Sequence, residues 1–223
     1  DSTWESEYRE VHQKAAVLYR KQARFQLITT GKISQKSLLF ENQHIERLIK
    51  ASRYFSYPFD AEYLKKKIEE ECRACDINQD YRLRISLSKS GKIELSRQIL
   101  TPLTPTFCKA KICLQEANLQ QAFTYFKTTH RPHLNLGEQE KIYYNKSGEL
   151  LETSIGNLVL KIGGKLYTPP IRLGILPGIY RQHLLETGEV EEKVLTLVDL
   201  AQAESVYGCN AVRGLYELSL EEN

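Results

Sequence analysis

The sequence predicts an α+β protein of two α/β subdomains, residues 1–100 and 107–223, joined by a short Pro-containing linker at 101–106. Segments with strand-like alternation and segments with helical periodicity are mixed on both sides of the linker. Two prolines within the six linker residues exclude a regular helix or sheet there. The length of 223 residues fits one large or two small domains, and 41% hydrophobic residues are typical of a globular protein.

The first half of the chain carries signals for helices, a strand and a hairpin. Apolar residues recur every three or four positions in the helical segments and alternate with polar residues in the strands. Asp60 is the expected N-cap of one helix, because its side chain can accept from free backbone N–H groups. The predicted segments are a lead-in helix at 1–24, a strand at 25–30, a turn at Gly31-Lys32, helices at 42–55 and 61–75, and a hairpin at 81–95 that turns at Ser90-Gly91.

The second half is expected to contain more strands. Gly163-Gly164 joins two of them, and Pro169-Pro170 ends that pair. Pro177 and Gly178 are typical of a helix start. The predicted segments are strands at 107–114, 123–126, 150–160, 165–168, 190–198 and 206–220, and helices near 137–144, at 177–186 and after a cap at Asp199.

Composition excludes several classes of protein. A net charge of +3 is too small to predict a nucleic-acid surface, and no apolar run approaches the roughly 20 residues of a membrane span. The acidic, polar N-terminus is not a signal peptide. Five widely spaced Cys argue against a disulfide scaffold and for a reducing compartment, so we expect a cytoplasmic protein. Cys72 and Cys75 form a lone CxxC, which we interpret as helix residues one turn apart rather than zinc ligands.

The chain contains no internal repeat and no GxGxxG, Walker or HExxH motif, so nucleotide and zinc sites of those types are not predicted. It begins at Asp1 and contains no Met, which predicts a piece of a longer polypeptide. The alternative is that methionine positions are missing from the sequence as written, which would put some short spacings off by one.

Lys127 lies between an aromatic run, which ends at Phe126, and a loop broken by Pro132. A lysine is normally a surface residue, and a solvated lysine at a strand end is the alternative interpretation. Among aromatic side chains, desolvation would lower the pKa of its amine from roughly 10.4. A neutral amine can attack a carbonyl and hold a Schiff base, so Lys127 is a candidate nucleophile.

Two further stretches could bind an anion. Arg47 precedes the apolar Leu48 in a predicted helix, so it lies at the edge of the buried face and could form a bidentate fork on a phosphate. The alternative is a surface arginine. Pro177 and Gly178 begin a helix whose first N–H groups are unpaired, which favours an anion, although nearly every helix has such an end.

A carboxylate and a glycine-flanked run complete the set of candidates. Glu152 lies in an apolar strand followed by small residues, which makes it a candidate functional acid; the alternative is an edge-strand glutamate that faces water. Gly208 and Gly214 flank a polar run, which predicts a bent or bulged strand or a close approach to a ligand. A lysine, an arginine, a helix N-terminus and a carboxylate are together the set that binds pyridoxal phosphate.

Six motifs follow one another here in the order typical of fold-type IV pyridoxal-phosphate enzymes: HIERL, YFKTTHR, ELLETSIGNLVL, YTPP, GILPGIYRQHLL and NAVRGL. The chain resembles this class IV aminotransferase family over residues 25–218. The family includes branched-chain and D-amino-acid aminotransferases and 4-amino-4-deoxychorismate lyase. KTTHR and NAVRG are most similar to the lyase, especially to the lyase half of a fusion with aminodeoxychorismate synthase component I.

The resemblance implies a role for each matching residue, with pyridoxal phosphate in the cleft between the subdomains and no metal. Lys127 would form the Schiff base and act as acid and base, and Glu152 would pair with the pyridine nitrogen. The other implied contacts are Arg47 and the backbone of Gly178 and Ile179 at the phosphate, Asn210 and Ala211 beside it, and Thr30, Arg131 and Arg213 near the substrate.

The implied reaction converts 4-amino-4-deoxychorismate to 4-aminobenzoate and pyruvate, a step toward folate. Arg131 and Pro132 stand where the aminotransferases usually carry a Tyr, which favours the lyase. The alternatives are a branched-chain or D-amino-acid aminotransferase and a non-catalytic domain of a larger chain. The expected partners are a small-molecule substrate, a second copy in a homodimer and an upstream synthase domain in the same polypeptide, with no nucleic acid and no membrane.

Overall fold

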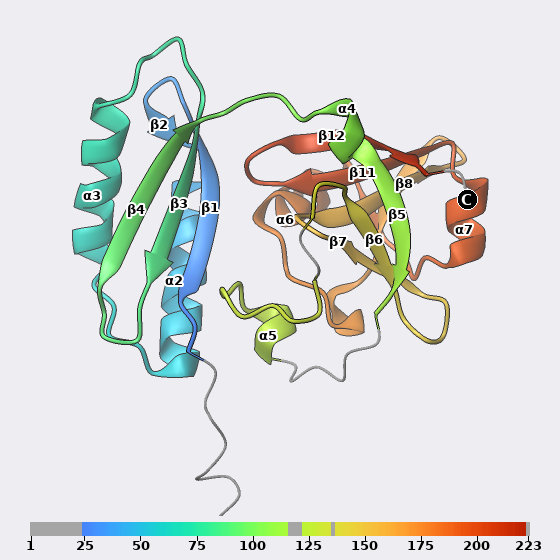
Figure 1. The fold of residues 1–223 in the computed structure, drawn as a ribbon, viewed down its shortest axis with the longest axis horizontal. Coiled ribbons are helices and arrows are strands. Elements are labelled where there is room, and N and C mark those ends of the chain that lie inside the picture. The colour runs from blue at the N-terminus through green and yellow to red at the C-terminus, as the bar shows by residue number, and fades with distance from the viewer. Residues whose placement is uncertain (1–23, 116–121, 135–136, 222–223) are drawn as a thin grey trace, which may run out of the picture.

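The computed structural model describes residues 24–115, 122–134 and 137–221. They form two subdomains, each built around its own β-sheet and each with helices, so the predicted α+β class is confirmed (Figure 1). The lead-in helix predicted at 1–24 lies outside the described residues except for Arg24. Among the described residues, no helix is both long enough and apolar enough to cross a membrane.

The N-terminal subdomain is a four-stranded antiparallel sheet in the order β2-β1-β3-β4, with two helices that pack against the same core. Its elements are β1 (Leu27–Ser34), β2 (Ser37–Leu38), α2 (Glu41–Phe55), α3 (Ala61–Arg73), β3 (Tyr81–Leu87) and β4 (Ile93–Ile99). The predicted helix cap is confirmed, because Asp60 accepts from the Tyr63 N–H at 2.9 Å.

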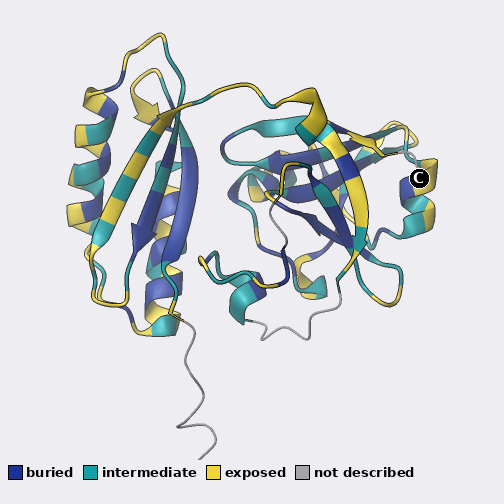
Figure 2. Cartoon of the chain, in the orientation of Figure 1, coloured by how far each residue is buried: buried dark blue, intermediate teal, exposed yellow. Residues whose placement is uncertain are grey.

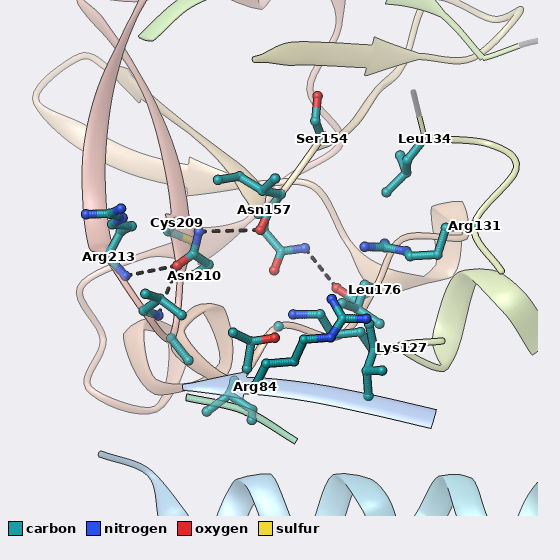
Figure 3. Close-up of a pocket in the computed structure, with 18 of the residues that line it drawn as sticks. Arg84, Lys127, Arg131, Leu134, Ser154, Asn157, Leu176, Cys209, Asn210 and Arg213 are labelled. Carbon is teal, nitrogen blue, oxygen red and sulfur yellow. Dashed lines mark hydrogen bonds between the residues drawn. The ribbon is translucent and has the colours of Figure 1, made fainter. Parts of the chain in front are cut away.

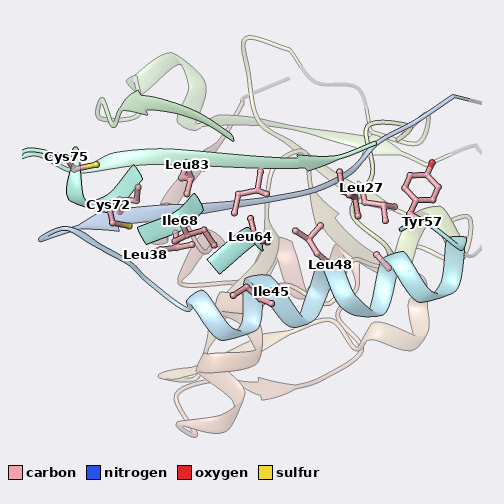
Figure 4. Packing of buried hydrophobic residues seen from close by; sticks show 14 residues of the cluster. Leu27, Leu38, Ile45, Leu48, Tyr57, Leu64, Ile68, Cys72, Cys75 and Leu83 are labelled. Carbon is pink, nitrogen blue, oxygen red and sulfur yellow. The ribbon is translucent and has the colours of Figure 1, made fainter. Parts of the chain in front are cut away.

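Strand alternation divides the residues of this sheet between two faces. Leu27 and Ile33 of β1 and Leu83 of β3 join the helices in one apolar cluster (Figure 4). Burying such a side chain contributes about 1.5–3 kcal/mol, which holds the helices on this face. The residues between them, such as Ile28 and Arg84, point to the opposite face, which is turned toward the second subdomain (Figure 1).

The turn predicted at Gly31-Lys32 is wrong, because both residues lie inside β1. The chain turns instead at Gln35 and Lys36, which have positive φ angles of 49° and 60°. Gly31 serves close packing: a Cβ there would lie 2.5 Å from Nε2 of the buried His44. Glycine is therefore required at this strand position because the His44 side chain packs against the backbone, and not because the chain turns there.

The C-terminal subdomain is built on an eight-stranded sheet in the order β10-β9-β8-β11-β12-β5-β6-β7. Because β7 also pairs with β8, six of these strands close into a ring. Its elements are α4 (Pro105–Cys108), β5 (Lys109–Leu114), α5 (Ala122–Tyr125), β6 (Lys141–Tyr144), β7 (Leu150–Thr153), β8 (Asn157–Ile162), β9 (Lys165–Thr168), η1 (Ile171–Leu173), α6 (Ile179–Glu186), β10 (Glu191–Glu192), α7 (Leu197–Gln202), β11 (Ser205–Asn210) and β12 (Gly214–Leu220).

Two predictions of element type are wrong in this half. The segment 123–126 is mostly the short helix α5, and its aromatic residues pack on Phe25 and Phe55 rather than forming a strand. The helix predicted near 137–144 is strand β6, whose Ile142 and Tyr143 are buried beside β5 and β7. Tertiary contacts override local propensity in both places.

Several boundaries in the second half also differ from prediction. The strand predicted at 150–160 is two strands joined by a tight turn, and the strand predicted at 206–220 is a hairpin. Only Glu191–Glu192 is a strand within 190–198, and Pro105 begins a helix before the strand predicted at 107. Thr196, not Asp199, is the N-cap of α7, and Asp199 is its capping-box partner.

Burial follows these layers. The strands β1, β3, β7 and β8 are largely buried, whereas β4 alternates between exposed and half-buried residues (Figure 2). Cys72 and Cys75 are free thiols buried in the N-terminal core; Cys72 lies in α3 and Cys75 just beyond its end. β1 and β3 are thus covered on both faces, by the helices on one and by the second subdomain on the other.

Candidate active site

A pocket of about 890 Å³ lies between the two subdomains. The N-terminal sheet contributes the outward-facing residues of β1 and β3, among them Thr30 and Arg84. The C-terminal subdomain contributes the segment around Lys127, the β7–β8 turn, the start of α6 and the β11–β12 turn. Figure 3 shows Arg84 and Lys127 on one side of this space and Asn157 and Asn210 on another.

The backbone around Lys127 is attached to the N-terminal sheet. Ile28 donates its N–H to the Lys127 carbonyl at 2.9 Å, and Thr129 donates to the Gln26 carbonyl at 2.9 Å. Leu27 and Thr128 form an antiparallel bridge between these bonds. Lys127 therefore follows a helix and not the predicted strand, but strand-like pairing with β1 determines its position.

The amine of Lys127 lies in a strongly cationic region. Burial, followed by the charges of Arg47, Arg131, Arg82 and Arg84, holds the pKa of this lysine well below its usual range. Both effects disfavour an added positive charge. A larger fraction of Lys127 is therefore a neutral, nucleophilic amine near pH 7 than for a solvated lysine.

Arg47 crosses from the N-terminal subdomain to the start of α6. Its Nη2 donates to the carbonyl oxygen of Pro177 at 2.7 Å. Burial, and secondly the charge of Arg131, lower the pKa of Arg47 to about 10, so it stays cationic at neutral pH. Gly178 is the N-cap of α6 and offers no side-chain acceptor to the helix N–H groups. A cation and a helix N-terminus thus meet at one place, which favours an anion.

Close packing keeps a side chain away from the start of α6. A Cβ on Gly178 would lie 1.9 Å from Oδ1 of Asn157. Asn157 in turn donates from Nδ2 to the Leu176 carbonyl at 2.8 Å, which ties β8 to the segment before the helix. Ile179 follows as the first residue of α6, and both residues line the pocket.

Glu152 lies just behind the pocket wall and is 2% exposed, so the interpretation as an edge-strand glutamate facing water is wrong. Leu176 donates its N–H to Oε2 at 3.4 Å, and Nη2 of Arg131 lies 3.5 Å from the same oxygen, an ion pair without good hydrogen-bond geometry. Burial raises the pKa of Glu152 to about 7, although Arg131, the Leu176 N–H and Lys127 all favour the charged form. Oε1 has no hydrogen-bond partner in the described part of the chain.

The β11–β12 turn closes another side of the pocket. The N–H groups of Val212 and Arg213 both donate to Oδ1 of Asn210 at 2.9 Å, and Ala211 lies between. Gly214 follows with a φ of +67°, a value that glycine adopts without strain. The run between the two glycines is therefore the end of β11 followed by a turn, so the predicted bent or bulged strand is wrong, whereas the predicted approach to a ligand agrees with its place in the pocket lining.

The structure brings the predicted site residues together from both subdomains. All of them line the pocket except Glu152, which is covered by the lining residues Arg131 and Leu176. Arg131, expected near the substrate, lies beside Glu152. Arg213 donates to the Thr101 carbonyl in the connection between the subdomains.

Sequence reasoning missed two arginines of this site, Arg82 and Arg84 on β3. Arg84 is paired in register with Thr30 on β1, so the two side chains are neighbours on the pocket face. Two arginines at alternate positions of an otherwise apolar strand were the available signal, since such a strand rarely presents two unpaired cations to a covered face.

Comparisons with known proteins place the whole site within one matched region. The model of the family described as amino-transferase class IV matches residues 26–219. An "Aminodeoxychorismate lyase" of Saccharomyces cerevisiae is 32% identical over 119 residues, which cover 42% of this chain and 32% of that protein. A "Putative aminodeoxychorismate lyase" of Schizosaccharomyces pombe is 24% identical over 163 residues, 67% of this chain and 68% of that protein.

The fold also matches solved structures. A "Putative amino-acid aminotransferase" from Mesorhizobium loti is 27% identical with a TM-score of 0.77, and the match covers 88% of this chain and 100% of that chain.

Proposed function

The chain belongs to the class IV aminotransferase family, and from this we propose that it is a pyridoxal-phosphate-dependent lyase that converts 4-amino-4-deoxychorismate to 4-aminobenzoate and pyruvate. Members of this family bind pyridoxal phosphate. The lyase assignment is supported by two relatives named for that activity and by the cationic lining of the pocket. The cationic pocket lining is the strongest support, because it is a feature of this chain and not of a relative.

The residues present fit pyridoxal phosphate. Lys127, with its lowered pKa, would bind the aldehyde carbon through Nζ. Arg47 and the uncapped start of α6 at Gly178 and Ile179 would hold the phosphate, with Asn210 and Ala211 beside it. The buried, unpartnered Oε1 of Glu152 is a group that needs a polar partner, as the pyridine nitrogen would be.

The chain's own residues would supply proton transfer and charge. When bound, the cofactor supplies a ring that withdraws electrons from the substrate carbon that carries the nitrogen. Nζ of Lys127, once the substrate amine has replaced it on the aldehyde carbon, would take the proton from the carbon that carries the substrate nitrogen and could return it to the methylene of the departing enolpyruvyl group. The C–O bond breaks, the carbocycle becomes aromatic, and the proton count balances as 4-aminobenzoate and pyruvate. Lys127 must be neutral for the first transfer, as its surroundings favour.

The surplus of positive charge supports a substrate with two carboxylates. Arg47 accounts for one anion, the phosphate, and leaves Arg82, Arg84, Arg131 and Arg213 on the lining. Aminodeoxychorismate carries one carboxylate on its ring and one on its enolpyruvyl group. Arginine binds carboxylates through two parallel hydrogen bonds, so Arg82 and Arg84 are the proposed partners of one of them, near Thr30.

A branched-chain or D-amino-acid aminotransferase is the second candidate, supported by the Mesorhizobium loti structure. Pyruvate release separates the two. The lyase releases pyruvate from aminodeoxychorismate with no keto acid added, whereas an aminotransferase requires a keto acid to turn over. Purified protein that releases no pyruvate under these conditions, but transfers an amino group to a keto acid, would overturn the lyase proposal.

The setting of the enzyme is also part of the proposal. We expect subdomain boundaries at 1–100 and 107–223 around the linker 101–106, a homodimer, a cytoplasmic location and an upstream synthase domain in the same polypeptide. A non-catalytic domain remains the third reading. Yellow colour on addition of pyridoxal phosphate, lost in Lys127→Ala, would exclude that third reading.

A further inference from the structure

His133 is buried beside Glu152, and none of the roles assigned above involves it. It is 5% exposed, and its Nε2 lies 3.8 Å from Oε1 of Glu152. In the described part of the chain neither ring nitrogen of His133 has a hydrogen-bond partner, and neither has Oε1. Three polar atoms without partners therefore lie in one small, water-poor region. Buried polar groups of this kind are costly unless they satisfy one another.

Both side chains are shielded from water. His133 is 5% exposed and Glu152 is 2% exposed. Electrostatic interactions are stronger in such surroundings than in water. The separation of 3.8 Å is an ion-pair distance and exceeds the length of about 2.7–3.2 Å of an N–H···O hydrogen bond, so the two atoms must approach each other for Nε2 to donate.

The charge state of the ring decides which atom can donate. Burial, followed by the charges of Arg131 and His130, lowers the pKa of His133 to about 4. The ring is therefore neutral near pH 7 and carries a single N–H. When Glu152 is ionised, a hydrogen on Nε2 points toward Oε1, whereas a hydrogen on Nδ1 would leave a lone pair of Nε2 facing a lone pair of Oε1. The first tautomer is favoured.

Each oxygen of Glu152 then has its own donors. Arg131 and the Leu176 N–H lie at Oε2. His133 is the group at Oε1, and a carboxylate oxygen can accept two hydrogen bonds, so Oε1 keeps a second acceptor site for the pyridine nitrogen. Charge-assisted hydrogen bonds from both sides would hold the plane of the carboxylate and favour its ionised form.

We propose that His133 is a positioning residue for Glu152. Nε2 of His133 donates to Oε1 of Glu152 and holds the carboxylate charged and oriented behind the pocket. The purpose of that carboxylate, to pair with the pyridine nitrogen, rests on the proposed function; the contact itself does not. In metal sites, hydrogen-bond partners behind the metal-binding side chains orient those side chains. His133 would orient Glu152 in the same way for an organic cofactor.

The first test follows the carboxyl group of Glu152 by ¹³C NMR in the protein without cofactor, with Glu152→Gln to assign the signal. His133→Leu removes the donor and should raise the pKa of Glu152 by about one unit or more. His133→Gln keeps an N–H donor and should bring the pKa back toward the wild-type value. His183→Leu is the control, because its ring packs against Phe40 and Tyr180. Equal titration of Glu152 in the wild type and His133→Leu overturns the proposal.

A second measurement needs no variant. The ¹⁵N shifts of the His133 ring in the wild type, measured above the pKa of about 7 of Glu152, report which nitrogen carries the hydrogen, and we expect Nε2. A hydrogen on Nδ1 overturns the proposal even if His133→Leu fails to fold. Both measurements use the protein without pyridoxal phosphate, so a failure of the proposed function would show separately, as absence of cofactor binding at Lys127.

Discussion

Arg47 on α2 donates from Nη2 to the carbonyl oxygen of Pro177, 130 residues further along the chain, at 2.7 Å. This bond joins the helix layer of one subdomain to the start of α6 in the other. Pro177 directly precedes Gly178, the N-cap of α6, so the cation and the helix N-terminus lie at the same part of the pocket. Gly178 has no side chain that could accept from the first N–H groups of the helix. The anion site therefore exists only when both subdomains are in place.

Arg47→Ala should weaken binding of pyridoxal phosphate roughly 10- to 100-fold, because a hydrogen bond to a charged group contributes about 1.5–3 kcal/mol. A titration of the cofactor absorption band measures the change. Arg53→Ala is the matched control, since Arg53 is exposed on the same helix. Wild-type affinity in Arg47→Ala would show that the phosphate is bound elsewhere.

Gly178→Ala should also weaken cofactor binding, by roughly tenfold or more, because the added methyl group would lie 1.9 Å from Oδ1 of Asn157. Overpacking of this kind costs about 1–3 kcal/mol and displaces the start of α6. Gly137→Ala is the control, since a Cβ there meets no atom of the described residues within 4 Å. Unchanged affinity together with an unchanged melting temperature would contradict this account of the α6 start.

Glu152→Gln tests the buried acid through stability alone. Burial raises the pKa of Glu152 to about 7, whereas an unfolded glutamate titrates near 4.3. Between these values the folded protein holds a proton that the unfolded chain has released. The contribution of this group to stability is therefore complete below about pH 4.3 and is lost as the pH rises through about 7, by up to about 4 kcal/mol.

Glutamine cannot lose this proton, so the melting temperature of Glu152→Gln relative to the wild type should rise by several degrees between pH 5 and 8. The lowered pKa values of His44 and His133 act in the opposite sense, but both residues are present in both proteins. Thermal unfolding without cofactor, followed across this range, measures the difference. Parallel curves for the two proteins would mean that Glu152 titrates normally.

Arg84→Ala should raise the KM for aminodeoxychorismate roughly tenfold or more and leave the affinity for pyridoxal phosphate unchanged. Arg84 lies on β3 opposite Thr30, and the proposed phosphate site lies at Arg47 and α6. One lost bidentate contact to a carboxylate accounts for this magnitude. Arg73→Ala, exposed on α3, is the control. A wild-type KM in Arg84→Ala would show that Arg84 of β3 does not bind the substrate.

Elements governed by local signals were predictable from sequence. The helix α3 begins after its N-cap Asp60 and buries Leu64 and Ile68, which are four positions apart. The β3–β4 hairpin forms where apolar and polar residues alternate along the sequence. The errors at α5 and β6 have a different cause. Phe123 and Tyr143 are stabilised by partners distant in the chain, so no short window of sequence contains the deciding contacts.

The site residues that lie in family motifs were predictable from the sequence. The contacts between residues of separate segments were not. Lys127, Arg47 and Gly178 lie in motifs, and the structure gathers them at one pocket. The bond from Ile28 to Lys127 and the contact of His133 with Glu152 join separate segments. Their geometry depends on how the strands pair, which a linear pattern does not specify.

The central claim is that the amine of Lys127 carries the cofactor, and one measurement tests it most directly. Purified protein is saturated with pyridoxal phosphate, reduced with borohydride and digested, and the peptides are identified by mass spectrometry. We expect a pyridoxyl group on Lys127, retained in Lys32→Arg and absent in Lys127→Arg. A saturated wild-type protein that yields no reduced adduct at Lys127 would rule out this lysine as the residue that binds the cofactor.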